Sequence, residues 1–133
     1  MKRFYQTLIA FVAVAVLALP TLATAGAYLP GNVYIVDDTY MIADFNVRFN
    51  SSAGSNDAIG VSGGGGGGIN IVAVKGSGNT ATYWSCYVPT TSALFPMASS
   101  ILNHATNGWR LSAFKSGSYC TNIYQETWSY RLN

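Results

Sequence analysis

The sequence has little charge and few cysteines, histidines and prolines. Of its 133 residues, 9% are charged, whereas 50% are hydrophobic and 14% are aromatic. Disordered chains have the opposite composition, with many charges and few aromatic residues. The length is that of one domain, so a single globular domain is expected.

Clustered positive charge is also missing. Two of the seven basic residues, Lys2 and Arg3, fall in a segment that we expect to be removed, which leaves five basic against five acidic residues. Phosphate binding depends on clustered Lys and Arg side chains, which scattered and balanced charges do not provide. Nucleic acid and anionic membrane surfaces are therefore not expected partners.

The first 25 residues have the three parts of a secretory signal peptide. Lys2 and Arg3 precede an apolar run at 8–19, and Ala23-Thr24-Ala25 provides small residues for cleavage. The apolar run is shorter than the roughly 20 residues that span a bilayer. We expect cleavage after Ala25 and an exported product, 26–133, in the periplasm or outside the cell, with no membrane insertion. An uncleaved N-terminal anchor is the alternative.

Cys86 and Cys120 are the two cysteines of the chain. Because exported proteins meet oxidising conditions, we predict that they form a disulfide. In the chain-entropy model this bridge would stabilise the fold by roughly 3 to 4 kcal/mol. With both thiols paired, His104 has no partner for a zinc site, so no metal and no cofactor are expected.

The first half of the mature chain predicts two strands and a loop. The strands are expected at 32–36 and 41–49, and the second strand alternates apolar residues at 43, 45, 47 and 49 with polar ones. Residues 51–68 are rich in Ser, Asn and Gly and predict a flexible loop. Its six glycines are not followed by the Lys-Ser/Thr pair of a phosphate-binding loop, so nucleotide binding is not expected.

The second half predicts strands at 69–74, 80–88, 109–115 and 119–132. One helix is expected at 92–107, where apolar residues recur at helical spacing. The fold class is therefore mainly β with one helix. One helix between strand regions favours a single OB-like domain over 26–133, a small five-stranded Greek-key barrel of OB type that is closed by the disulfide.

Aromatic residues together with Asn, Ser and Thr suit the binding of glycans. Aromatic rings stack on the C–H faces of sugars, and amides and hydroxyls bond to sugar hydroxyls. The last strand would place three aromatic side chains on one face. The candidate ligand-binding residues are Trp84, Trp109, Tyr124, Trp128 and Tyr130.

A small hydrolase is the enzymatic alternative. Glycoside hydrolysis needs two carboxylates, and here Glu126 could act with Asp37, Asp38 or Asp44. The spacing of these residues says nothing about their mutual distance. We prefer a non-enzymatic interpretation, in which these carboxylates solvate a turn and the polar faces of strands.

Residues 84–132 resemble the binding subunits of AB-type bacterial toxins, and most closely the subtilase-cytotoxin B-subunit group. The resemblance rests on the strand Trp84-Ser85-Cys86-Tyr87-Val88, the helix at 92–107, the segment 108–112 and the turn at 116–120. It implies an OB-type barrel, a ring of five subunits, recognition of cell-surface glycans and a separate catalytic A subunit. A periplasmic or secreted protein-interaction or inhibitor module without a sugar site is the alternative.

Overall fold

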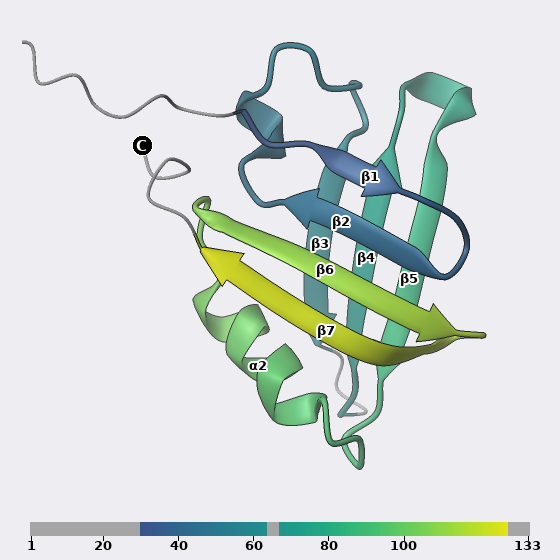
Figure 1. The fold of residues 1–133 in the computed structure, drawn as a ribbon, viewed down its shortest axis with the longest axis vertical. Helices are drawn as coiled ribbons and strands as arrows, with labels where there is room; N and C mark the ends of the chain where they lie inside the picture. Colours follow the sequence, from purple (N-terminus) through teal and green to yellow (C-terminus); the bar gives the residue numbers. More distant parts are fainter. Residues whose placement is uncertain (1–29, 64–66, 128–133) are drawn as a thin grey trace, which may run out of the picture.

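The structure, a computed structural model, describes residues 30–63 and 67–127, and the expected signal peptide lies outside them. Within these two ranges the fold is mainly β, with one α-helix and two short 3-10 turns (Figure 1). The elements are β1 (Val33–Ile35), β2 (Tyr40–Asp44), η1 (Val47–Phe49), β3 (Ala58–Gly63), β4 (Ile69–Lys75), η2 (Gly78–Thr80), β5 (Thr82–Val88), α2 (Phe95–His104), β6 (Trp109–Ser116) and β7 (Tyr119–Thr127).

The seven strands form one mixed sheet in the order β1-β2-β6-β7-β5-β4-β3. Neighbouring strands are antiparallel except β5 and β7, which share one parallel bridge, Tyr87 with Tyr119. The sheet bends at this bridge, so β1, β2, β6 and β7 form a front layer that crosses the back layer of β3, β4 and β5 (Figure 1). Helix α2 lies at one end, against β3, β4 and β7.

The predicted closed five-stranded barrel is therefore wrong, because the sheet is open and has seven strands. Two local predictions caused this error. The expected strand at 41–49 ends at Asp44, and the chain then forms the 3-10 turn η1. The expected loop at 51–68 contains a complete strand, β3, which is paired with β4 from Ala58 to Gly63.

At Asp44 the strand β2 ends, although the predicted alternation of apolar and polar residues continues to residue 49. Its side chain is 1% exposed and accepts hydrogen bonds from Arg110 and from the N–H of Asn32. The next polar residue, Asn46, is fully buried as well. Buried polar groups require partners, and the bonds of Asp44 come from residues far along the chain. The alternation of apolar residues therefore does not decide the conformation after Asp44.

Strand β3 forms although its composition is that of a loop. Ile59 and Val61 pack against the hydrophobic core and supply the apolar face of the strand. Asp57 fixes the start of β3 through a 2.7 Å bond from Lys75 Nζ and a 2.6 Å bond from the N–H of Gly76. Burial acts to raise the pKa of the Asp57 carboxyl, but the hydrogen bonds from Gly76 and Lys75 outweigh burial and hold the pKa below its usual range.

The predicted disulfide between Cys86 and Cys120 is confirmed. It joins β5 to β7, next to the single bridge between Tyr87 and Tyr119. Both cysteines belong to a core that lies between the two layers and is closed at one end by α2. Along the described part of the chain, no helix has the length and apolar character that crossing a membrane requires.

Gly31 lies buried where the chain enters β1. A Cβ there would overlap the side-chain oxygen of Asn46 and would lie 2.9 Å from the backbone nitrogen of Val47. We therefore expect Gly31→Ala to lower the free energy of unfolding by about 2–3 kcal/mol through overpacking. Urea unfolding measures this loss.

The matched control is Gly60→Ala on β3, where an added Cβ meets nothing within 4 Å. An alanine in a strand also costs less backbone entropy on folding than a glycine. Gly60→Ala should therefore unfold at the same urea concentration as the original chain, or at a slightly higher one. Equal stabilities of the two alanine variants would contradict the prediction.

Candidate functional site

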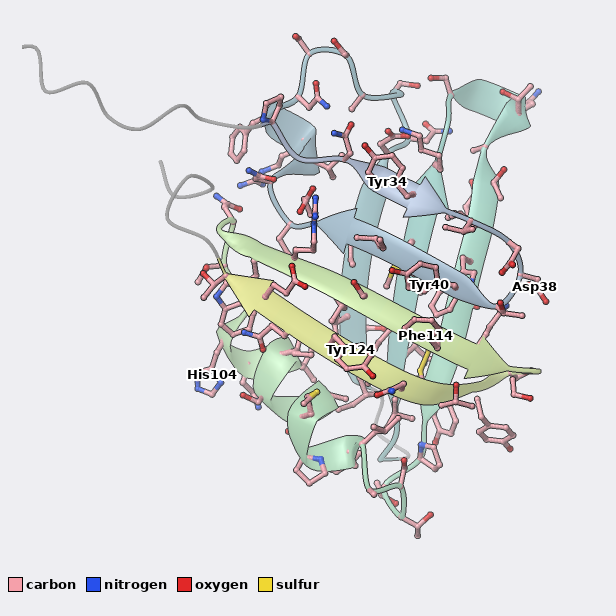
Figure 2. The ribbon with its side chains drawn as sticks, in the orientation of Figure 1. Tyr34, Asp38, Tyr40, His104, Phe114 and Tyr124 are labelled. Carbon is pink, nitrogen blue, oxygen red and sulfur yellow. A yellow bond between two sulfur atoms is a disulfide. The ribbon has the colours of Figure 1, made fainter. Side chains whose placement is uncertain are left out.

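The outward side of the front layer carries a group of large side chains that we call the aromatic face: Tyr34, Tyr40, Ile42, Phe114 and Tyr124. They point away from the core because alternate residues of a strand lie on opposite sides of the sheet. The strand register aligns Tyr34, Ile42, Ser112 and Tyr124 in one row across the layer. Tyr40, Phe114 and Asn122 form the adjacent row. Figure 2 shows the four rings over the front strands.

The rings of the aromatic face support one another. Tyr40 and Phe114 are stacked with ring centroids 4.2 Å apart, and Tyr124 meets Phe114 edge-on at 6.1 Å. The amide nitrogen of Asn122 donates a 2.7 Å hydrogen bond to the hydroxyl of Tyr124. Tyr34 and Tyr124 remain 51% and 52% exposed. The face therefore offers two half-exposed phenol rings, and packing and a hydrogen bond fix the position of one of them.

One end of the aromatic face is bordered by a row of charges across three strands. Asp44 on β2 is aligned with Arg110 on β6, and Arg110 with Glu126 on β7. Arg110 Nε and Nη2 donate to the two Asp44 carboxylate oxygens at 2.8 and 3.1 Å. Because Asp44 is engaged in this way, it is a poor acid or base for the hydrolase alternative with Glu126.

The other end of the face is bordered by the turn between β1 and β2. Lys115 Nζ lies 2.8 Å from the Asp38 carboxylate and 5.3 Å from the centre of the Trp84 ring. Asp37 accepts bonds from the hydroxyl and the N–H of Thr39, which lower the pKa of the Asp37 carboxyl. Asp37 is therefore charged at neutral pH, and Asp38 beside it forms the ion pair with Lys115.

The structure places the predicted ligand-binding residues in different surroundings. Tyr124 belongs to the aromatic face, whereas Trp84 is 1% exposed and lies in the core, away from the surface. Trp109 is partly buried and packs against the core. Trp128 and Tyr130 lie outside the described residues.

Sequence reasoning missed Tyr34, Tyr40 and Phe114. The pattern that could have revealed the two tyrosines is the alternation of side chains along 33–36 and 40–43. Tyr34 and Tyr40 are next to the buried residues Val33 and Met41 and therefore point to the opposite side of the sheet. Strands of three and five residues are too short for that alternation to stand out.

Metal ligation has no support among residues 30–63 and 67–127, which contain no group of three or more His, Cys, Asp or Glu side chains able to hold an ion. His104 is exposed at the end of α2, and its Nδ1 lies 3.0 Å from the carbonyl oxygen of Ser100. The imidazole is therefore engaged with its own helix.

No family model, curated protein or solved structure matches the chain. What bears on function is therefore the aromatic face, the charges at its two ends and the sequence patterns.

Proposed function

We propose that the protein is an exported, non-enzymatic binding domain that recognises cell-surface glycans through the aromatic face. The observation that carries the proposal is the row in which Tyr34 and Tyr124 stand half exposed at either side of Ile42 and Ser112. Phenol rings stack on the C–H faces of sugars, and their hydroxyls bond to sugar hydroxyls.

Two further features support this proposal. Exposed groups of large apolar side chains mark interaction sites on small proteins, and the amide of Asn122 adds a polar group beside Tyr124. Export agrees with the signal-peptide pattern and with the disulfide, which is typical of proteins outside the reducing cytosol.

The test is binding of the oxidised chain 26–133 to a glycan array, followed by titration of the best ligand. Tyr34→Ala and Tyr124→Ala should each weaken that binding by about ten-fold, because each removes one stacking ring. The matched control is Tyr83→Ala, which removes a tyrosine that is 70% exposed on β5 in the back layer. Thermal unfolding checks that all three variants are folded.

Two results would contradict the glycan proposal. One is a folded protein that binds no glycan on the array. The other is an equal loss of binding in Tyr83→Ala, since that ring lies in the other layer.

The resemblance to toxin binding subunits extends the proposal to a ring of five and a separate A subunit. Native mass spectrometry of the oxidised chain 26–133 tests the assembly directly. A closed pentamer would support the toxin-like arrangement, and a monomer would favour a binding domain that acts alone.

A protein-interaction or inhibitor module without a sugar site is the second candidate, and strand β3 favours it. β3 contains no charged residue and pairs with β4 alone within the described part of the chain. Uncharged edge strands can accept a strand from another protein. Capture of one protein at a fixed stoichiometry, together with an empty glycan array, would select this candidate.

A further inference from the structure

The two half-exposed tyrosines of the aromatic face lie at opposite sides of the front layer. Tyr34 is on β1 and Tyr124 is on β7, with β2 and β6 between them, and both tyrosines belong to one row across the strands. Neighbouring strands lie about 4.8 Å apart, so the three steps from β1 to β7 separate the two backbone positions by about 14 Å. A pyranose ring is about as wide as a phenol ring, so one sugar cannot contact both tyrosines.

The part of the face without charged side chains is longer across the strands than along them. It consists of two rows, one containing Tyr34 and the other containing Phe114, which lie about 7 Å apart because alternate residues of a strand point to the same side. The next residues on that side of β2 and β6 are Asp44 and Arg110, and the other end meets the turn that holds Asp38. Figure 2 shows the four rings of the face following one another across the front strands. A chain-like ligand therefore fits the face across the strands.

Packing leaves two of the four rings available to a ligand. Tyr40 and Phe114 stack on each other with centroids 4.2 Å apart, so each ring covers one face of the other. Tyr124 meets Phe114 at an interplanar angle of 84° and is not stacked on it. Tyr34 and Tyr124 are the rings that remain half exposed. The Tyr40–Phe114 stack therefore supports the face, and the two half-exposed rings offer contacts at its two sides.

The surface between the two half-exposed tyrosines is open. Ile42 and Ser112 occupy the middle positions of the row, and both are more buried than the tyrosines beside them. Three hollows of about 260 to 340 Å³ in the described part of the chain are lined by other residues, and no side chain of the aromatic face lines them. A pocket encloses most of a small ligand, whereas an open row of rings contacts a ligand one unit at a time. Affinity on this face therefore depends on how many units of the ligand make contact.

We infer that the aromatic face binds an extended, linear glycan chain of at least four sugar units, which crosses the strands and stacks two units, three positions apart, on Tyr34 and Tyr124. This inference rests on the proposed function and specifies the ligand of that site. Each unit of an extended β-1,4-linked chain advances it by about one strand spacing, so three steps between strands match three steps along the glycan. Once one unit is stacked, the second contact becomes intramolecular and adds affinity without a second loss of translational freedom.

The experiment measures affinity against chain length. The probes are β-1,4-linked oligosaccharides of glucose, N-acetylglucosamine and mannose in lengths from one to six units, printed beside branched glycans that present the same sugars only as single units at their ends. In at least one series, binding should strengthen by about ten-fold between two and four units, because the longer chain reaches the second ring, and should change little beyond four. The branched glycans should bind no more tightly than the single sugars.

Tyr34→Ala tests whether the gain with length comes from the second ring. It should weaken binding of the four-unit chain by about ten-fold but that of the two-unit chain by no more than about two-fold, because a short chain still stacks on Tyr124. Tyr34→Phe keeps the ring and should keep the dependence on length. The matched control is Tyr83→Ala in the back layer, whose dependence on length should equal that of the original chain.

The outcomes separate this inference from the proposed function. Three results overturn the inference and leave glycan binding intact: affinity that does not rise with chain length, tighter binding of the branched glycans than of every linear series, or equal losses for the two-unit and four-unit chains in Tyr34→Ala. A folded protein that binds no member of the array, linear or branched, overturns the proposed function, and the inference with it.

Discussion

Loss of the Cys86–Cys120 disulfide should lower the free energy of unfolding by about 3–4 kcal/mol. The bridge closes a loop over a sequence separation of 34, which restricts the unfolded chain. In this fold it also secures a weak junction, because β5 and β7 share a single ladder bridge, Tyr87 with Tyr119, to which the bond from the N–H of Tyr87 to the carbonyl of Ser118 belongs. Reduction should therefore leave this single bridge and the packing of the shared core to hold the two layers together.

Urea unfolding with and without a reductant measures this effect. The variant Cys86→Ser/Cys120→Ser should match the reduced original chain and should not respond to the reductant. For a domain of this size, each kcal/mol lost lowers the melting temperature by about 4–8 °C. Unfolding at the same urea concentration in both redox states would show that the ladder and the core hold the layers together without the bridge.

Arg110→Met should destabilise the protein by about 3–5 kcal/mol, the second large effect that we expect. It leaves the carboxylate of Asp44, which is 1% exposed, without the guanidinium that binds both of its oxygens. A buried charge without its partner is far more costly than the intact pair is stabilising. The loss should appear in urea unfolding at pH 7.

The double variant Asp44→Asn/Arg110→Met identifies the cause. An amide in place of Asp44 removes the buried charge and can still accept the 2.9 Å bond from the N–H of Asn32, so it should recover more than half of the loss. The control is Asp38→Asn, which breaks the pair with Lys115 at a carboxylate that is 90% exposed and should cost less than about 1 kcal/mol. No recovery in the double variant would attribute the loss to packing of the Arg110 side chain.

The parts of the fold that the sequence predicted depend on local patterns. Strands β4, β5 and β6, the helix and the pairing of Cys86 with Cys120 follow from periodicity, composition and the count of thiols. The helix is shorter than predicted, beginning at Phe95 and ending at His104. Its first turn holds Pro96, which is tolerated there because the first N–H groups have no partner within the helix.

The parts that the sequence did not predict depend on contacts between distant residues. Asp44 ends β2 through Arg110, 66 residues further along the chain, and no local pattern reveals that pair. β3 was missed because Ile59 and Val61 stand among Gly, Ala and Ser, and only the partner strand β4 makes them a strand. The aromatic face was missed for the same reason, since Tyr34 and Tyr124 come to lie in one row only after β1, β2, β6 and β7 have been aligned.

The order of strands in the sheet also determines where folding is entropically costly. The hairpins β1–β2 and β6–β7 and the three-stranded unit β3–β4–β5 each join strands that are neighbours in sequence. Pairing of β2 with β6 instead closes a loop that contains the whole three-stranded unit and the helix. Such closures are slow, because the chain between the two strands loses conformational entropy before the contacts between β2 and β6 form. We expect the three units to form early and the seam between β2 and β6 to set the folding rate.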